Sequence, residues 1–434
     1  MVNDPIRRVL VLRQARGVWT VLTPWNFPVN IPIEYLGPAI ATGSRVVWKP
    51  APTTTAVAAL LLEILLEGGV PPELVSLVHS DSVALAQHLV THPGITCVGL
   101  TGGPNAGRAV AQAAWDKHLL LELGGNGPVI VFSDADIEKA SAGIAVASFF
   151  NAGQVCAASG RRVLAHSAIA DDLAAALVQR TKEWPVGNPT EEGIAMGPLH
   201  LDAILTTVNR HVRDAIDRGA KLLNGMPTSR YYCPTVLDEV PVDSLVSVEE
   251  TFGPVVAIVR QDDDDELLET ACRTRYSLAC SVFIESVSRV FKVAERMPSG
   301  TVVVNDASCY WEHNLSFGGW AGTLSGRGRL WGRLRARRVH PEQNSFVRYS
   351  LTGYGNRDLA DWELPVETIQ SRVRSRAQVR RDAMSCREVE DQRHSCRRRL
   401  SWARSNPAPY ALARQPRPRY ACVRPYRARP STSA

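Results

Sequence analysis

Residues 327–434 contain no lysine, although they hold 25 arginines and nine acidic residues, which gives this stretch a charge of +16. The other 326 residues carry 24 basic and 34 acidic side chains, a balance of −10. The formal net charge of +6 therefore comes from the last quarter of the chain alone. It gives no information about the partners of the rest of the protein.

Long hydrophobic runs are also absent. The strongest one, residues 56–66, is 11 residues long and is interrupted by Glu63, whereas a membrane-spanning helix needs roughly 20 apolar residues. Residues 1–16 are polar and mixed in charge, unlike a secretory signal or an organelle transit peptide. The nine cysteines form no Cys-x-x-Cys pair, which fits reduced thiols better than a disulfide framework or a zinc site. We therefore predict a cytoplasmic protein with no membrane segment and no metal site.

The chain has 434 residues, 45% of them hydrophobic, so it can bury a core for two or more domains. Over residues 17–125, short apolar runs alternate with helical patterns, as in a parallel sheet with helical crossovers. Strands are expected at residues 17–22, 45–48, 74–78, 96–100 and 118–121, and helices at 53–67, 82–90 and 107–115. These patterns predict a doubly wound α/β unit.

A second unit begins near residue 128 and closes with the glycine-rich segment Phe317-Gly-Gly319. Its expected strands are residues 128–132, 255–259, 279–284 and 300–305, and its expected helices are 137–149, 168–184 and 201–219. The acidic Asp134-Ala-Asp136 suits a helix start, where a carboxylate is stabilised by the helix dipole. The predicted fold class is therefore α/β in both units.

The most informative cysteine is Cys156, in the segment Phe150-Asn-Ala-Gly-Gln-Val-Cys156. A glycine three residues earlier, in a turn of small residues after an apolar helix, suits a thiol that a substrate must approach closely. The thiolate is the nucleophilic form, so such a cysteine is expected in a polar or dipolar setting that lowers its pKa. The ordinary alternative is an inert buried thiol. The residues around Cys156 argue against that alternative.

Glu122, in Leu121-Glu-Leu-Gly-Gly-Asn126, is a candidate general base. A carboxylate between leucines loses contact with water, which raises its pKa and suits it to accept a proton near neutral pH. The alternative is an acid in a plain turn at a strand end. The spacing to Cys156 does not by itself indicate contact.

Two further segments follow predicted strands, where open α/β sheets bind their ligands. Asn26, in Thr23-Pro-Trp-Asn-Phe-Pro28, can donate its amide to a developing oxyanion. A rigid turn packed by Trp25 and Phe27 is the alternative there.

The second segment, Leu100-Thr-Gly-Gly-Pro-Asn-Ala-Gly107, opens a helix. Its glycines and the helix dipole suit the binding of a pyrophosphate, and a tight turn is the alternative.

Taken together and in order, these segments resemble the aldehyde dehydrogenase superfamily over about residues 8–328. Further motifs that carry the resemblance are Trp48-Lys-Pro50, Gly187-Asn-Pro189, Met196-Gly-Pro198, Pro234-Thr-Val236, Glu249-Glu-Thr-Phe-Gly-Pro254, Val304-Asn305 and Phe317-Gly-Gly319. The resemblance implies a Rossmann-like parallel-sheet cofactor domain, partly present at residues 17–125. A second α/β domain, the catalytic domain, is expected at residues 126–328.

In this family a cysteine attacks an aldehyde to give a thiohemiacetal, which passes a hydride to NAD or NADP and leaves a thioester for water to hydrolyse. The resemblance assigns Cys156 as the nucleophile, Glu122 as the base that activates the water, and Asn26 as half of the oxyanion hole. The residues matched to cofactor binding are Trp25, Lys49, Gly102, Gly103, Gly107, Glu250 and Phe252. Pro52 stands where the family often has a ribose-binding Glu or Ser, so NAD and NADP both remain open, with a slight preference for NAD.

Both ends depart from the family pattern. Residues 1–16 are expected to be an arm or strand leading into the first domain, as in a chain truncated at its N-terminus. Residues 329–434 stand where the family usually has a strand that joins a neighbouring subunit. The resemblance implies a homo-oligomer, but the contacts between subunits at both ends are then expected to be incomplete in this chain. The alternatives are an inactive truncated remnant and a member that releases the acyl group to coenzyme A.

The tail could also bind nucleic acid through phosphates, since it is rich in arginine. Against this, it has few alternations of aromatic and basic residues. Arg, Pro and Ala have GC-rich codons whereas Lys does not, so the composition also fits a reading-frame slip in GC-rich DNA. The favoured interpretation is a disordered or frame-shifted tail, with a small-molecule aldehyde as the partner of the rest of the chain.

Overall fold

The computed structural model describes residues 15–157, 160–225, 229–310, 312, 314–320, 322–330 and 344–347. All of these belong to one compact unit of the chain. The expected arm at residues 1–16 lies almost entirely outside the described residues, and so does most of the expected tail at 329–434. Within the range of that tail, the strand Asn344–Val347 is described and pairs with the second sheet.

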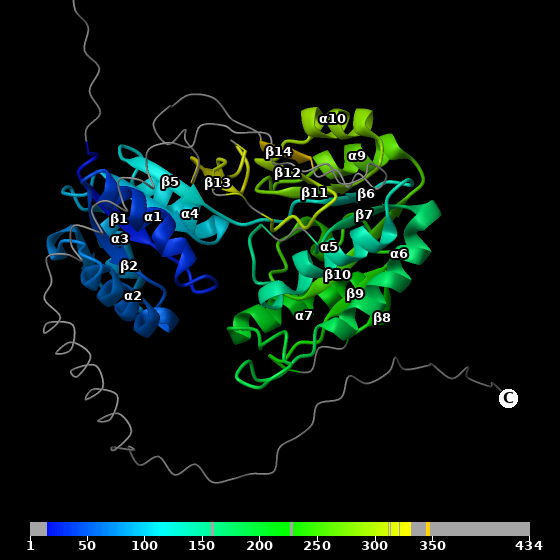
Figure 1. Cartoon of the computed structure of the whole chain (residues 1–434), viewed down its shortest axis with the longest axis horizontal. Helices are drawn as coiled ribbons and strands as arrows, with labels where there is room; N and C mark the ends of the chain where they lie inside the picture. The colour runs from blue at the N-terminus through cyan, green and yellow to red at the C-terminus, as the bar shows by residue number, and fades with distance from the viewer. Residues whose placement is uncertain are drawn as a thin grey trace, which may run out of the picture. The chain divides into compact units, whose positions relative to one another are not determined.

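The first of two sheets has six strands in the order β13-β5-β4-β1-β2-β3, drawn mostly in blue and cyan in Figure 1. Its strands are β1 (Val18–Leu22), β2 (Arg45–Lys49), β3 (Val75–Leu77), β4 (Cys97–Thr101), β5 (His118–Glu122) and β13 (Gly326–Arg327). The helices between them are α1 (Asn30–Ala41), α2 (Thr55–Glu67), α3 (Val83–Thr91) and α4 (Pro104–Ala113). All neighbouring strands are parallel except β13, which returns from the far end of the chain and pairs antiparallel with β5.

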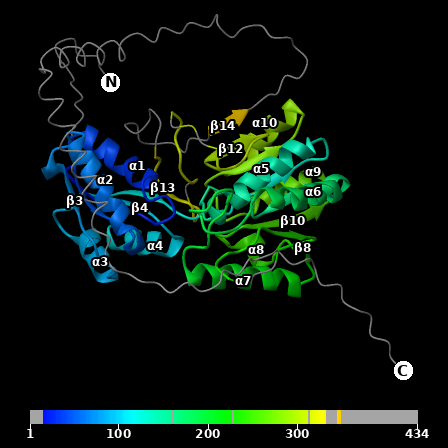
Figure 2. The same ribbon diagram turned by 60° about the horizontal axis from the view of Figure 1, so that its bottom comes forward.

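The second sheet has eight strands in the order β14-β12-β11-β6-β7-β10-β9-β8, and only β8 runs antiparallel to its neighbour. Its strands are β6 (Val129–Val131), β7 (Val163–His166), β8 (Lys221–Asn224), β9 (Thr235–Asp238), β10 (Val255–Gln261), β11 (Cys280–Phe283), β12 (Thr301–Val304) and β14 (Asn344–Val347). Its helices are α5 (Ile137–Phe149), α6 (Ser167–Arg180), α7 (Asp202–Asp217), α8 (Leu245–Val248), α9 (Asp264–Cys272) and α10 (Val287–Arg296). In Figure 2, α5 packs beside α6, and α7 beside α8.

The largest core cluster surrounds the second sheet. Strands β6, β11 and β12 are buried along their whole length. A parallel sheet covered on both faces needs such uninterrupted apolar strands, because neither face meets water. The predicted α/β class is therefore confirmed in both sheets.

The expected helix at residues 137–149 is observed with these same ends. Asp136 caps it, since its carboxylate accepts a hydrogen bond from the backbone N–H of Lys139 at 3.1 Å. The sequence patterns missed α1, which contains Pro32, Gly37 and Pro38. Pro32 lies in the first turn, where a missing N–H costs little. The sequence analysis also missed β7, β8, β9, β13, β14, α8, α9 and α10.

The carboxyl ends of the first sheet's strands bring the predicted site segments to one edge. The register pairs Leu22 with Lys49 across β1 and β2, and Leu22 with Leu100 across β1 and β4. Thr101 pairs with Glu122 across β4 and β5. The loops that follow these strands therefore leave the sheet side by side, which is where α/β sheets place their ligand sites.

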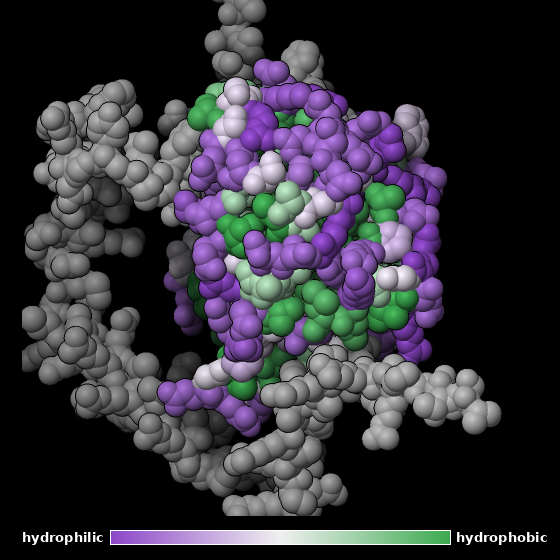
Figure 3. Space-filling view, turned by 90° about the vertical axis from the view of Figure 1, so that its right-hand side faces the viewer, coloured by the Kyte–Doolittle hydropathy of each residue, from purple (hydrophilic) through white to green (hydrophobic). Residues whose placement is uncertain are grey.

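On the face seen in Figure 3, hydrophilic residues surround smaller hydrophobic patches. Scattered apolar residues of this kind are common on protein surfaces. Across the described ranges, each helix is too short or too polar to span a bilayer.

Candidate active site

Cys156 and Glu122 lie in contact, although 34 residues separate them in the chain. The Cys156 thiol donates a hydrogen bond to Glu122 Oε1 at 2.9 Å. The expectation of a lowered pKa for Cys156 is wrong in this structure: burial raises the pKa well above its usual value, and the Glu122 charge raises it further. Burial also raises the pKa of Glu122, while the bonds from Cys156 and Thr101 lower it. The resting thiol is thus protonated and its proton already points at a base.

The second oxygen of Glu122 is held by a chain of hydroxyl groups. Thr101 donates to Glu122 Oε2 at 2.8 Å, and the Tyr35 hydroxyl lies 2.9 Å from Thr101 Oγ1. All three side chains are buried. A carboxylate fixed at both oxygens keeps its orientation, which a general base requires. The sequence analysis missed Tyr35 and gave Thr101 no role, because it attributed the function of that segment to the glycines.

The loop that precedes Cys156 adopts a strained backbone. Asn151, Ala152 and Gly153 have consecutive positive φ angles of 52°, 54° and 68°. Such angles disfavour residues other than glycine, so surrounding contacts must hold them. A side chain at Gly153 would also collide with the backbone of Gly253, 2.2 Å from its carbonyl oxygen. The glycine three residues before the cysteine is therefore required by the loop itself.

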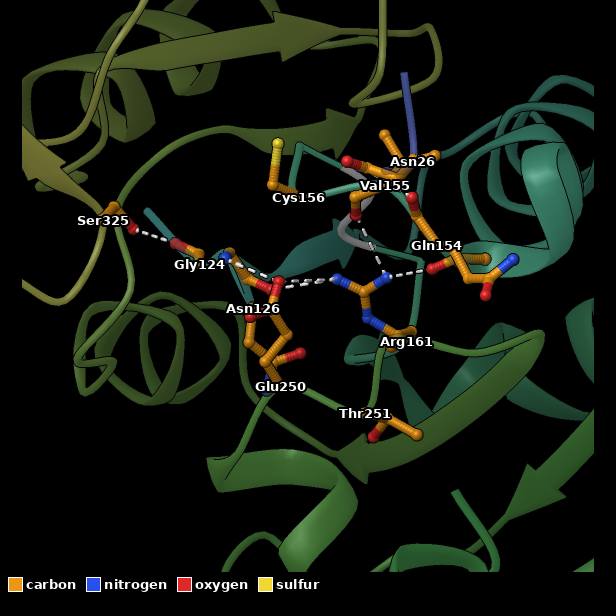
Figure 4. A network of polar contacts seen from close by, with 12 residues as sticks. Asn26, Gly124, Asn126, Gln154, Val155, Cys156, Arg161, Glu250, Thr251 and Ser325 are labelled. Atoms are coloured by element: carbon orange, nitrogen blue, oxygen red, sulfur yellow. Dashed lines mark hydrogen bonds and ion pairs between the residues drawn. The ribbon is translucent and has the colours of Figure 1, made fainter. Parts of the chain in front are cut away.

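Asn26 is bound to this same loop. Its amide nitrogen donates to the Gln154 carbonyl at 3.0 Å, and the Asn151 amide donates to the Asn26 carbonyl at 3.0 Å. Figure 4 shows the Asn26 side chain beside Val155, next to Cys156 in the chain. An amide nitrogen carries two N–H groups. One therefore anchors Asn26, and the other can be donated to a substrate oxygen.

Arg161 connects the two loops that carry the reactive pair (Figure 4). Its guanidinium donates to the carbonyls of Gly153 and Val155 at 2.8 and 3.2 Å, and to that of Gly125 at 2.9 Å. The side chain is completely buried. The cysteine loop and the glycines after Glu122 are thus joined through one buried cation. The sequence analysis missed this residue, because a single arginine five positions after a cysteine has no periodicity or motif to mark it.

Glu250 is a second acidic residue of the site and lies beside Arg161. Its Oε1 accepts the backbone N–H of Gly125 at 2.9 Å and is 3.8 Å from the Arg161 guanidinium. Burial raises the pKa of Glu250 to about 7, although Arg161 and the Gly125 N–H both lower it. Glu250 is therefore held against the two loops that carry Glu122 and Cys156, and it is not a solvated surface acid.

The predicted aromatic residues Trp25 and Phe252 pack edge to face, with ring centroids 5.8 Å apart. Trp25 also stacks on His200 at 4.4 Å. Lys49 stands at the end of β2, where burial lowers its pKa and the Asp81 charge raises it. Its backbone carbonyl accepts the N–H of Thr23 at 3.2 Å, which connects it to the loop that carries Trp25.

The segment Gly102-Gly103 leads into α4, which has no acidic residue in its first turn and no side-chain cap. Its first N–H groups are thus able to bind an anion. A Cβ added at Gly103 would meet nothing within 4 Å, so this end of the helix can be approached closely. Gly107 differs, because a Cβ there would lie 2.3 Å from Leu123. Gly102 and Gly103 therefore fit a pyrophosphate, and Gly107 allows α4 to pack on Leu123.

Gly125 and Gly103 make a matched pair for a stability test. A Cβ at Gly125 would lie 1.8 Å from the Cys156 carbonyl oxygen, so Gly125→Ala forces apart the two loops of the site. We expect Gly125→Ala to lose about 1–3 kcal/mol of unfolding free energy, and Gly103→Ala to lose much less. Urea unfolding measures both. Equal stability of the two variants would contradict this packing.

A pocket of about 380 Å³, counting its open mouth, leads to the reactive pair. The residues that line it are Phe27, Asn30, Ile31, Glu34, Glu122, Val155, Cys156, Ala157 and Phe317. A largely apolar wall with a few polar groups is typical of small-molecule sites. In the part of the chain that the structure describes, no three His, Cys, Asp or Glu side chains are placed to hold a metal ion.

The chain is similar in sequence and in fold to known proteins. The chain is 35% identical over 305 residues to the NADP⁺-dependent succinate-semialdehyde dehydrogenase of Escherichia coli strain K12. This match covers 69% of this chain and 63% of that protein. It is 37% identical over 306 residues to the mitochondrial succinate-semialdehyde dehydrogenase of Arabidopsis thaliana, with 69% and 58% covered. The crystal structure of an NAD-dependent aldehyde dehydrogenase from Sinorhizobium meliloti matches with a TM-score of 0.71 at 33% identity, covering 74% of this chain and 64% of that one.

The chain thus spans 58% to 64% of the length of these three proteins. The model of the aldehyde dehydrogenase family matches residues 2–336, which is most of the chain. With this match, the resemblance inferred from the motifs is confirmed: the chain belongs to the aldehyde dehydrogenase family.

Proposed function

We propose that this protein oxidises an aldehyde to a carboxylic acid with NAD⁺ or NADP⁺, through a thiohemiacetal and a thioester on Cys156. The observation that carries the proposal is the 2.9 Å hydrogen bond from the Cys156 thiol to Glu122, two residues that line one pocket, with Asn26 bonded to the loop that carries Cys156. The first experiment mixes the purified chain with aldehydes and either cofactor, and follows NADH or NADPH by absorbance. No reduced cofactor with any aldehyde would favour the alternative of an inactive remnant.

In the first step, Glu122 takes the proton of the Cys156 thiol and the sulfur bonds to the aldehyde carbon. The carbonyl oxygen gains the electron pair of its π bond and becomes negatively charged. The second amide N–H of Asn26 and the backbone N–H of Cys156 donate to this oxyanion. Their preorganised dipoles stabilise the charge where it develops. The product of this step is a thiohemiacetal on Cys156.

When bound, NAD⁺ or NADP⁺ supplies the hydride acceptor that converts this adduct into a thioester. Glu122 then releases to solvent the proton that it took from the thiol. Once ionised again, it takes a proton from a water molecule as the water attacks the thioester carbon. The carbon–sulfur bond breaks, the carboxylic acid leaves, and Cys156 recovers its proton. The raised pKa of Glu122 makes it a stronger base than an exposed carboxylate.

The residues proposed to hold the cofactor are Gly102 and Gly103 for the pyrophosphate, Lys49 and Glu250 for the two riboses, and Trp25 and Phe252 beside the rings. Gly107 supports the same turn by its close packing. Pro52 begins a short 3₁₀ helix just after Lys49 and has no N–H to donate to a ribose hydroxyl. NAD and NADP both remain open, with NAD slightly preferred, and their kcat/KM values decide between them.

Asn26→Ala tests the oxyanion site. We expect kcat/KM for aldehydes to fall by about 10²–10³-fold, while binding of NADH or NADPH, measured by the fluorescence of the reduced cofactor, stays near the wild-type value. Asn30→Ala, which changes an asparagine that lines the pocket but has no proposed role toward the oxyanion, is the control. A fall of less than about threefold in the Asn26 variant would exclude its amide from the oxyanion site.

Product analysis with and without coenzyme A separates a carboxylic acid from an acyl-coenzyme A. The proposal predicts the acid in both cases.

A homo-oligomer and a cytoplasmic location remain predictions; size-exclusion chromatography and cell fractionation test them. Nucleic-acid binding by the tail is not expected. Translation of the DNA downstream of Gly328 in the other reading frames tests whether the tail arose from a frame slip.

A further inference from the structure

One buried histidine has no part in the proposed reaction. His211, on α7, is completely buried, and its Nδ1 lies 3.0 Å from Oγ1 of Thr251, which is also completely buried. The ring Nε2 lies 3.2 Å from the Arg210 guanidinium and 3.3 Å from the Glu249 carboxylate. Burial and the Arg210 charge lower the pKa of this ring, although Glu249 and Asp214 raise it. The ring is therefore neutral near pH 7, and with one donor and one acceptor nitrogen it can bond on both sides.

Thr251, the partner of His211, belongs to the segment that the proposed function assigns to the cofactor. It lies between Glu250, proposed to hold a ribose, and Phe252, proposed to lie beside the rings. In Figure 4 the Thr251 side chain points away from the Glu250 carboxylate. The bond to His211 therefore holds this segment from one side, while the Glu250 carboxylate, next to Arg161, holds it from the other.

The backbone of this segment is strained at Phe252. Its φ angle is 54°, in the left-handed region that residues other than glycine disfavour, so surrounding contacts must hold it. Helix α7 supplies such contacts on both sides of Phe252. His211 bonds Thr251 before it. Val208, three residues earlier on the same helix face, lies against Gly253 after it, where an added Cβ would be 2.5 Å from the valine. The position of Phe252 thus depends on α7.

We propose that His211 is a positioning residue for cofactor binding, which through Thr251 holds the segment of Glu250 and Phe252 ready for NAD⁺ or NADP⁺. This inference rests on the proposed function and adds to it a residue on which the cofactor site depends. Without the bond, part of the binding free energy is spent on ordering the segment, so cofactor affinity falls. Once the cofactor is bound, the segment is ordered again and the chemical steps change little. The expected signature is a raised dissociation constant with a nearly unchanged kcat.

The experiment measures the Kd of NADH and of NADPH for the full chain by fluorescence, without aldehyde. Thr251→Val keeps the shape of the side chain and removes its hydroxyl, and His211→Leu removes both ring nitrogens. We expect each variant to raise Kd by about tenfold, with kcat at saturating cofactor within about threefold of the wild type. The double variant is expected to show the same tenfold effect and not a hundredfold one, because both changes remove one bond.

Two further variants separate positioning from stability. His211→Asn keeps an amide N–H close to the place of Nδ1, so we expect its Kd to stay within about threefold of the wild type even where urea unfolding shows a loss of stability. Thr270→Val is the matched control, since it also removes a buried hydroxyl that bonds a side chain, Gln261 at 2.9 Å, and lies on α9. It is expected to keep the wild-type Kd.

Hydrogen exchange of the protein without cofactor gives a readout that does not depend on activity. Thr251→Val is expected to speed the exchange of residues 249–254 and to leave strand β9 unchanged, because the bond holds this segment locally. Equal acceleration across the whole protein, or none in residues 249–254, would overturn the inference.

A Kd within about threefold of the wild type in Thr251→Val would also overturn it, and so would a hundredfold effect in the double variant, since the two side chains would then act separately. Aldehyde oxidation would persist in both cases, and the proposed function would stand. If His211→Leu fails to fold, Thr251→Val and His211→Asn decide alone. A wild-type protein that binds neither NADH nor NADPH would overturn the proposed function and this inference together.

Discussion

Cys156→Ala is expected to lower aldehyde oxidation by at least about 10⁴-fold, because none of the other described residues that line the pocket can form the thioester. The variant keeps a small apolar residue at a site packed against the first sheet's core, so it is expected to fold. Cys272→Ala, on the distant helix α9, is the matched control and keeps full activity. The measurement is the rate of NADH or NADPH formation with a fixed aldehyde. A signal that survives Cys156→Ala would contradict the proposed mechanism.

Glu122→Gln is expected to have the next largest effect, a fall of about 10²–10⁴-fold in kcat. The glutamine can accept the Thr101 hydrogen bond but cannot take a proton from water. Loss of the Glu122 charge removes one cause of the raised pKa of Cys156, so the thiol can lose its proton to water and the thioester still forms. Its hydrolysis becomes slow, and reduced cofactor appears as a burst of about one equivalent per site followed by a slow phase. Rapid-mixing absorbance measures this burst. Loss of the burst and the steady rate together would instead place Glu122 mainly in thiol activation.

The pH dependence of the same variant tests the ionisation of Glu122. A carboxylate base must be deprotonated to act, so wild-type activity is expected to fall as the pH falls through its pKa. Because burial raises that pKa, the fall begins at a higher pH than for an exposed glutamate. Glu122→Gln is expected to lack this acid limb, whereas Glu63→Gln keeps it. A retained limb in Glu122→Gln would assign the titration to another group.

The sequence motifs identified the reactive residues but not their contacts. Cys156 and Glu122 were recognised from their local segments, yet their approach to 2.9 Å depends on how the second sheet's loop meets the end of β5. That approach is set by non-local packing, which periodicity does not report. Arg161 was missed for the same reason, since its three carbonyl partners come from segments up to 36 residues away.

Some helices and strands were predicted from local sequence patterns, and others were not. Helix α5 was predicted with its observed ends, because a capping aspartate and an apolar stripe mark it locally. Helix α1 was missed because two prolines and a glycine interrupt its pattern, although it supplies Glu34 to the pocket. Strand β13 was beyond sequence prediction, since a two-residue strand becomes visible only through its pairing with β5. One of the elements that local patterns describe least well, α1, thus lines the pocket.

Covalent trapping on Cys156 tests the central claim most directly. Intact-mass spectrometry of Glu122→Gln, mixed with excess aldehyde and oxidised cofactor, measures the adduct on the protein. We predict an increase equal to the mass of the aldehyde less two hydrogens, which is the acyl group of a thioester, located on Cys156 by peptide mapping. An unmodified Cys156 under conditions where reduced cofactor is formed, or an acyl group on another residue, would contradict the account.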